Sequence, residues 1–217
     1  MEVTIRNAPS FANLLVNLYP GDRIVAEADA MASMSSGIEM TTRWNGGVFR
    51  AIARRIFGGE SIFVNEFKST KSGHIVITQP FPGDMACLEL KGNTMFLQPG
   101  AYIASEPQVT LGLGWAGIRS FISGEGLFRM KVSGYGRVWF GAYGAIFTRE
   151  VEGEYIVDTG HLVAYEPTIG IRVGMAGGIF SSFFGGEGLI TRVNGQGKIY
   201  MQSRSFEGLA AWTNAHL

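Results

Sequence analysis

The feature that most constrains this chain is a spacing of residues that occurs three times along it. Each copy opens at a turn glycine, reaches an alanine 11 or 12 residues later, and arrives at a glycine–glutamate pair whose glutamate lies 33 to 39 residues from the opening glycine. The opening glycines are Gly21, Gly92 and Gly153, the alanines are Ala32, Ala104 and Ala164, and the glutamates are Glu60, Glu125 and Glu187. Because a fixed period marks a repeated unit even when each copy is weak, the sequence predicts three tandem repeats.

Short runs of β-branched, aromatic and alternating residues, bounded by turn residues, predict strands along most of the chain. The clearest runs are Leu14–Leu18, Ile62–Phe67, His74–Thr78, Val109–Leu113, Arg137–Phe140, Ile169–Val173 and Lys198–Met201. After each glutamate the pattern gives a strand, a glycine turn and another strand, so we expect a hairpin there. The exception is Val48–Phe57 (VFRAIARRIF), where the apolar residues share one helical face and predict a short helix.

These units predict one domain rather than three. A repeat of roughly 60 residues buries too little apolar surface to be stable alone. We therefore expect a single all-β domain over residues 1–217, with pseudo-threefold repeats at about 20–81, 92–152 and 153–211. The first copy is the longest, and its surplus coincides with the predicted helix, which we interpret as an insertion.

Composition and charge exclude some of the classes of protein to which this chain could belong. Hydrophobic residues make up 46% of the chain, which excludes a disordered chain despite the 31 glycines. Eighteen basic residues balance eighteen acidic ones, so the electrostatic attraction that drives generic nucleic-acid binding is absent. Cys87 is the single cysteine and cannot form an intrachain disulfide. With no signal-peptide pattern and no apolar run of spanning length, we expect a cytoplasmic protein without a transmembrane segment.

Several segments resemble a known family in the same order along nearly the whole chain. They are GGES at Gly58–Ser61, PGD at Pro82–Asp84, LQPGAYIAS at Leu97–Ser105, GEGLF at Gly124–Phe128, GEYIVDTGHLVAYEP at Gly153–Pro167, GGEGL at Gly185–Leu189 and QSR at Gln202–Arg204. By these segments the chain resembles the bacterial and archaeal relatives of the altered-inheritance-of-mitochondria protein.

This resemblance implies a fold and an assembly but no catalytic residues. The implied fold is three repeats of a shortened double-stranded β-helix, similar to the tryptophan RNA-binding attenuation protein, and the implied assembly is a homotrimer. For mitochondrial members the family implies a role in inner-membrane and respiratory organisation. That role transfers poorly to a chain in which we find no targeting segment.

The candidate site residues admit structural and functional interpretations. Glu60, Glu125 and Glu187 could surround the pseudo-threefold axis and bind a hard cation through oxygen. A carboxylate beside consecutive glycines can instead accept backbone N–H groups and fix a tight turn, which we favour. His161 is interpreted as a hydrogen-bonded structural histidine rather than a proton-transfer group. His74 and His216 lie far from it in sequence, so we expect no metal site and no cofactor.

Two further motifs are interpreted as structural. Gly112–Gly117 (GLGWAG) satisfies the dinucleotide-binding pattern GxGxxG, but no βαβ pattern surrounds it, so we expect no nucleotide there. Cys87 lies in the apolar run MACLEL, where we expect a buried, inert thiol.

Two function classes remain. We favour a non-catalytic, homo-oligomeric scaffold or binding protein, because apolar surface and open sheet edges must be covered. The family resemblance favours a trimer. The alternative is a module that binds a small ligand or RNA, although the neutral charge argues against RNA. The apolar segments 49–57, 118–122 and 179–184 form either core or a contact surface, and the arginines of the first leave a peripheral membrane contact open.

Overall fold

The computed structural model describes residues 1–44, 63–115, 128–175 and 189–216, and within these ranges the chain is predominantly β. The strands are β1 (Glu2–Arg6), β2 (Asn13–Leu18), β3 (Arg23–Glu27), β4 (Met31–Met34), β5 (Ile38–Trp44), β6 (Phe63–Ser69), β7 (Gly73–Ile77), β8 (Met85–Leu97), β9 (Tyr102–Ser105), β10 (Val109–Trp115), β11 (Phe128–Gly141), β12 (Ile146–Asp158), β13 (Leu162–Tyr165), β14 (Ile169–Met175) and β15 (Leu189–Gln202). The remaining described elements are a 3-10 turn, η1 (Thr159–His161), and an α-helix, α4 (Phe206–His216). Each predicted strand segment overlaps one of these strands, so the β class is confirmed.

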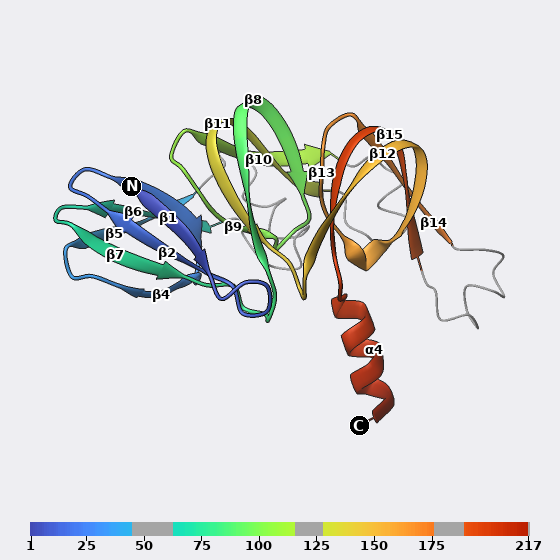
Figure 1. Cartoon of the computed structure of the whole chain (residues 1–217), viewed down its shortest axis with the longest axis horizontal. Coiled ribbons are helices and arrows are strands. Elements are labelled where there is room, and N and C mark those ends of the chain that lie inside the picture. Colours follow the sequence, from blue (N-terminus) through green and yellow to red (C-terminus); the bar gives the residue numbers. More distant parts are fainter. Residues whose placement is uncertain (45–62, 116–127, 176–188, 217) are drawn as a thin grey trace.

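The strands form two antiparallel sheets. The smaller has the order β1-β2-β7-β4. The larger has the order β12-β15-β13-β8-β11-β9-β3-β6-β5, with β10 added to β11 and β14 added to β15. Figure 1 shows an elongated body with β4 and β5 near one end, β12 and β14 near the other, and α4 projecting from it.

The same order of elements occurs in three segments, which we call the first (residues 13–77), second (85–141) and third (146–202) segments. The second and third each run through a long strand, a four-residue strand, a seven-residue strand and a second long strand. In the first segment the long strands are divided, into β2 and β3 and into β6 and β7. The opening glycines share one backbone conformation, with φ of +91° at Gly21, +89° at Gly92 and +88° at Gly153, which favours glycine.

The buried residues separate into three clusters that follow the three segments. The first surrounds Phe67 and Trp139, the second Leu97 and Phe140, and the third Val193 and Ile199. Alternation creates these clusters: in β2 (NLLVNL) every second residue is buried, as period-two side-chain placement requires.

The predicted hairpins are wrong in all three segments. In the first, β6 and β7 lie in different sheets and do not pair with each other. In the second and third, β11 and β15 run on as single strands through the expected glycine turns. Gly134 and Gly136 have φ of +104° and +122°, and the register shifts between Ser133 and Tyr135. The glycines therefore form an irregularity that redirects a continuous strand, rather than reversing it.

Two further differences concern positions along the chain. Strand pairing places Ser33, not the predicted Ala32, where Ala104 and Ala164 lie, because the register shifts between Met31 and Ser33. The C-terminal helix α4 was not expected inside a repeat reaching residue 211. It forms because Ser205 Oγ accepts the backbone N–H of Gly208 at 3.1 Å, as an N-cap does, ahead of an alanine-containing run. The predicted helix at 48–57 lies outside the described residues.

Candidate functional site

The most regular polar feature is a side chain that fastens the turn after each four-residue strand. Glu106 Oε2 accepts the backbone N–H of Arg137 at 3.0 Å, and Glu166 Oε2 accepts that of Lys198 at 2.9 Å. The bonds are reciprocal, because the N–H groups of Glu106 and Glu166 donate to the carbonyl oxygens of Arg137 and Lys198 at 2.9 and 3.1 Å. Each glutamate thus ties its turn to the second long strand of its segment.

Ser35 makes the same pair of bonds in the first segment. Its Oγ accepts the backbone N–H of His74 at 3.0 Å, and its own N–H donates to the His74 carbonyl oxygen at 2.9 Å. We call the positions of Ser35, Glu106 and Glu166 the clamp positions. Sequence reasoning did not identify them, although the Glu-Pro dipeptides at 106–107 and 166–167 were a usable signal.

A glycine precedes the residue that each clamp position holds. A Cβ at Gly136 would lie 2.9 Å from Glu106 Oε2, and one at Gly197 would lie 2.7 Å from Glu166 Oε2. A Cβ at Gly73 would lie 2.8 Å from Ser35 Cβ. Because these separations are shorter than real Cβ contacts, glycine allows the clamp side chain to reach the backbone.

The charges at the clamp differ between segments. The Arg137 guanidinium donates to Glu106 Oε1 through Nε at 2.9 Å and Nη2 at 2.7 Å, and it lies 5.2 Å from the Trp139 ring centroid. Lys198 instead pairs with Glu150 at 3.1 Å, and this hydrogen bond raises the pKa of the lysine. The Glu106 carboxylate therefore already accepts three N–H donors, which suits a structural link better than a metal ligand.

The predicted glutamate site cannot be placed. Glu60, Glu125 and Glu187 lie outside the described residues, as do the apolar segments 49–57, 118–122 and 179–184. Among the residues that the structure describes, no three His, Cys, Asp or Glu side chains gather as metal ligands would.

His161 is part of a hydrogen-bonded junction where the third segment begins its four-residue strand. Its Nδ1 donates to the Gln202 carbonyl oxygen at 2.7 Å, because a carbonyl oxygen only accepts. The buried Gln202 side chain accepts the Tyr143 backbone N–H at 2.9 Å and donates to the Gly160 carbonyl oxygen at 2.8 Å. His74 and His216 lie elsewhere, on β7 and α4.

The predicted burial of Cys87 is wrong, because its side chain is exposed. In β8 the residues Leu88 and Leu90 point into the core, so period-two alternation turns Cys87 outward with Glu89. Partial burial by the surrounding residues still raises the pKa of the thiol. This effect is larger than that of the Arg137 charge, which lowers the pKa. A raised pKa keeps the group in its less reactive protonated form.

The glycine motif at 112–117 does not begin a helix within the described residues. Gly112 and Gly114 lie inside β10, where they pair with Lys131 and Arg129 of β11. A dinucleotide site needs these glycines in a loop that leads into a helix N-terminus. Gly112 and Gly114 lie in a strand instead, so they do not form such a loop.

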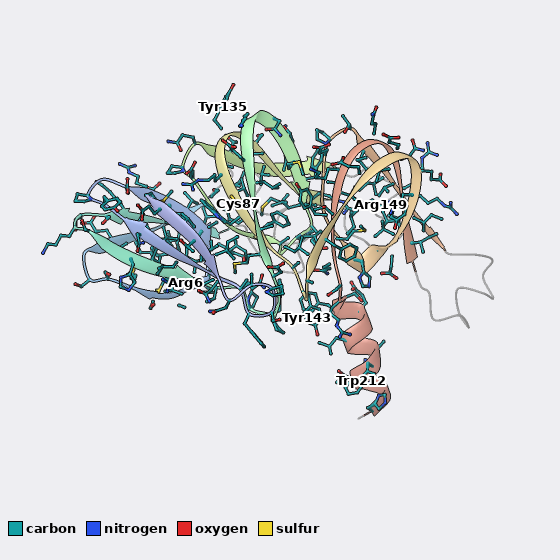
Figure 2. The ribbon with its side chains drawn as sticks, viewed as in Figure 1. Arg6, Cys87, Tyr135, Tyr143, Arg149 and Trp212 are labelled. Atoms are coloured by element: carbon teal, nitrogen blue, oxygen red, sulfur yellow. The ribbon has the colours of Figure 1, made fainter. Side chains whose placement is uncertain are left out.

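An aromatic contact attaches α4 to the body. The Phe206 ring stacks on Tyr143, with centroids 5.0 Å apart and planes at 12°, and meets Phe81 edge-on at 5.1 Å. Beyond Phe206 the helix is largely exposed, with Trp212 62% exposed and stacked on His216 at 4.5 Å. Figure 2 shows Tyr143 where the helix begins and Trp212 well away from the sheets.

These features define a class: a predominantly β protein of antiparallel sheets, in which a side chain fastens the turn after each described four-residue strand. In the described part of the chain, no helix is long and apolar enough to cross a membrane. The family model described as mitochondrial biogenesis AIM24 matches residues 3–204. The chain therefore belongs to this family, and the resemblance of its segments is confirmed.

Two similar proteins come from Streptococcus pyogenes. An uncharacterised protein of serotype M6 is 26% identical over 226 residues, an alignment that covers 100% of this chain and 91% of the relative. A crystal structure of a Streptococcus pyogenes protein matches with a TM-score of 0.80 at 26% identity, covering 100% of this chain and 99% of the other. The whole length of this chain is thus shared with both proteins.

Proposed function

We propose that the protein is a non-catalytic, homo-oligomeric scaffold, a trimer of chains that each contain three pseudo-threefold repeats of a short double-stranded β-helix. The observation that carries this proposal is the clamp, in which the recurring polar side chains bind backbone N–H groups of their own fold. In an enzyme, recurring acids would be expected to face a cleft that holds the substrate. Here Glu106 and Glu166 fix turns instead.

The repeat interpretation is supported by three kinds of agreement. The opening glycines have φ within 3° of one another, taking +91° and +88° as the extremes. The clamp bonds occupy the same place in all three segments, and a glycine precedes each residue whose backbone N–H the clamp side chain accepts. The four strand lengths are the same in the second and third segments, at 13, 4, 7 and 14 residues.

Light scattering of dilute protein tests the assembly. We expect a mass of about three times the 23.5 kDa chain. The mass should not change between low and high salt, because a mainly apolar interface is screened little. A mass of one chain across the micromolar range would contradict the scaffold proposal.

A second candidate function is peripheral contact with a membrane, and α4 is the observation that favours it. Leu209 and Trp212 are 46% and 62% exposed on a helix that projects from the body, and tryptophan suits the membrane interface. If this candidate is right, the protein should sediment with vesicles of anionic lipid and Trp212→Ala should not. Equal sedimentation of both proteins, or of neither, would contradict it.

The exposed Cys87 thiol favours a reducing compartment such as the cytoplasm.

A further inference from the structure

The three segments are joined to one another by their four-residue strands. Strand β9 of the second segment pairs with β3 of the first, with Ser105 opposite Val25 and Ala104 opposite Ala26. Strand β13 of the third segment pairs with β8 of the second. There Tyr165 lies opposite Phe96 and Ala164 opposite Leu97. Each junction therefore adds a short strand to the first long strand of the preceding segment.

Both junctions use the same register. In β9 and β13 the residue just before the clamp glutamate, Ser105 or Tyr165, pairs with Val25 or Phe96. Both of these partners lie four residues after the opening glycine of their segment.

Burial shows that the junctions complete the core. All four residues of β9 and all four of β13 are buried. Ile103 and Ala104 of β9 belong to the first core cluster, and Val163 and Ala164 of β13 belong to the second. No described residue of another segment's short strand belongs to the third cluster.

The remaining short strand, β4, has the opposite character. It carries no buried residue, and Met34 is 38% exposed. Its pairing with β7 places Met34 opposite Ile75, two residues after Gly73. Ser105 and Tyr165 lie opposite Val138 and Ile199, each two residues after the corresponding glycine. By this register Met34 is the equivalent of Ser105 and Tyr165.

The remaining long strand, β12, has a free edge at the equivalent place. Arg192, three residues before Gly195, lies opposite Ile156, whereas Lys131, three residues before Gly134, lies opposite Phe96. Ile156 is thus the equivalent of Phe96 by strand pairing, and it is 47% exposed. It lies three rather than four residues after its opening glycine, because β8 and β11 pair with a register shift that β12 and β15 do not have. Among the described strands, β12 pairs with β15 alone.

We propose that β4 of one copy adds to β12 of the next copy as an antiparallel strand, with Met34 opposite Ile156 and Ser33 opposite Val157. This proposal rests on the homo-oligomer proposed above and names its interface. The partner is a second copy because β4 and β12 can pair in the same register in which β9 pairs with β3 and β13 pairs with β8. Figure 1 places β4 and β12 at opposite ends of the body, so the two edges of one chain do not meet.

Three other free edges recur in every segment. Among the described strands, β5, β10 and β14 each pair on one side, in all three segments alike. By contrast, β4 lacks the second neighbour that β9 and β13 have, and β12 lacks the short-strand neighbour that β3 and β8 have among the described strands. A contact between two different edges is head-to-tail, and it gives a ring when the rotation closes.

Charge at the interface provides the first test. We expect Met34→Asp and Ile156→Lys each to reduce the scattering mass about threefold, to that of one chain, because a charge would be buried against an apolar side chain. The double variant Met34→Asp/Ile156→Lys should regain the wild-type mass, since the two charges would then lie opposite each other. Met40→Asp on β5 is the matched control, because Met40 is 46% exposed, and it should keep the wild-type mass. Both target side chains are exposed in one chain, so circular dichroism should show each variant folded.

Crosslinking provides the second test. In a Cys87→Ala background, Met34→Cys and Ile156→Cys together should form disulfides between chains on mild oxidation, because opposite residues lie within disulfide distance. Met40→Cys with Ile156→Cys is the control and should stay uncrosslinked. If the wild type is multimeric but Ile156→Lys keeps its mass and the cysteines do not crosslink, this interface is wrong and the scaffold proposal stands. If the wild type is one chain, both proposals fail.

Discussion

The clamp at Glu106 gives the sharpest prediction about stability, through the substitution Glu106→Ala. This change removes the acceptor of the Arg137 backbone N–H and both guanidinium bonds. The matched control is Glu154→Ala, because Glu154 also pairs with an arginine, Arg192, at 2.9 Å. Glu154 and Arg192 are 53% and 44% exposed, whereas Glu106 and Arg137 are 21% and 37% exposed.

The expected loss of stability differs between the two variants. A hydrogen bond to a charged group contributes about 1.5–3 kcal/mol when partly buried, and an exposed ion pair about 0–1 kcal/mol. We therefore expect Glu106→Ala to lower the free energy of unfolding by about 2–3 kcal/mol and Glu154→Ala by no more than about 0.5 kcal/mol. Glu106→Gln should fall between them, because the amide oxygen still accepts the backbone N–H without the charge.

Urea unfolding followed by circular dichroism measures these differences. At about 2–4 °C per kcal/mol for a chain of this size, Glu106→Ala should also lower Tm by roughly 4–12 °C. The reasoning fails if Glu106→Ala and Glu154→Ala unfold at the same urea concentration, or if Glu106→Ala matches the wild type.

The other predictions concern a glycine, the cysteine and the C-terminal helix. Gly134→Ala should lower the free energy of unfolding by about 3 kcal/mol in urea titrations, because its φ is +104° and a Cβ would lie 2.9 Å from the Gln108 carbonyl oxygen. Gly153→Ala, with φ of +88° and no neighbour within 4 Å, should cost only about 1 kcal/mol, and equal losses would contradict this account. Cys87 should react with iodoacetamide in the folded protein, but more slowly at pH 8 than free cysteine, since its raised pKa leaves less thiolate. Phe206→Ala should abolish the helical circular dichroism of α4 with little change in Tm, because an isolated 11-residue helix is marginal; unchanged helicity would show that the aromatic contact does not hold it.

The strands and the opening glycines were predictable from sequence because their signals are local. Alternation in β2 marks a half-buried strand, and Gly21, Gly92 and Gly153 need a backbone conformation that other residues disfavour. The exposure of Cys87 also has a local signal, since Glu89 two residues later indicates the outward face of the strand. The run MACLEL alternates between the two faces of β8, so its apolar composition alone does not predict burial of the cysteine.

The features that escaped prediction depend on contacts between distant residues. Whether Gly134 reverses a strand or bends it depends on β8 and β10, which pair with both sides of β11. The role of Glu106 depends on Arg137, which is 31 residues away. Similarly, α4 begins where Phe206 contacts Tyr143, which lies far from it in sequence. The local sequence signal for this helix is the N-cap residue Ser205.

Hydrogen exchange of the native protein, read by mass spectrometry, tests the central claim most directly. The claim is that another copy covers both β4 and the outer edge of β12. The account predicts slow exchange of the backbone amides in 31–34 and 154–158, as slow as in β9 and β8. In Ile156→Lys the amides of both segments that face away from β7 and β15 should exchange fast. If the wild type and Ile156→Lys exchange these two segments equally fast, no second copy covers them and the account is contradicted.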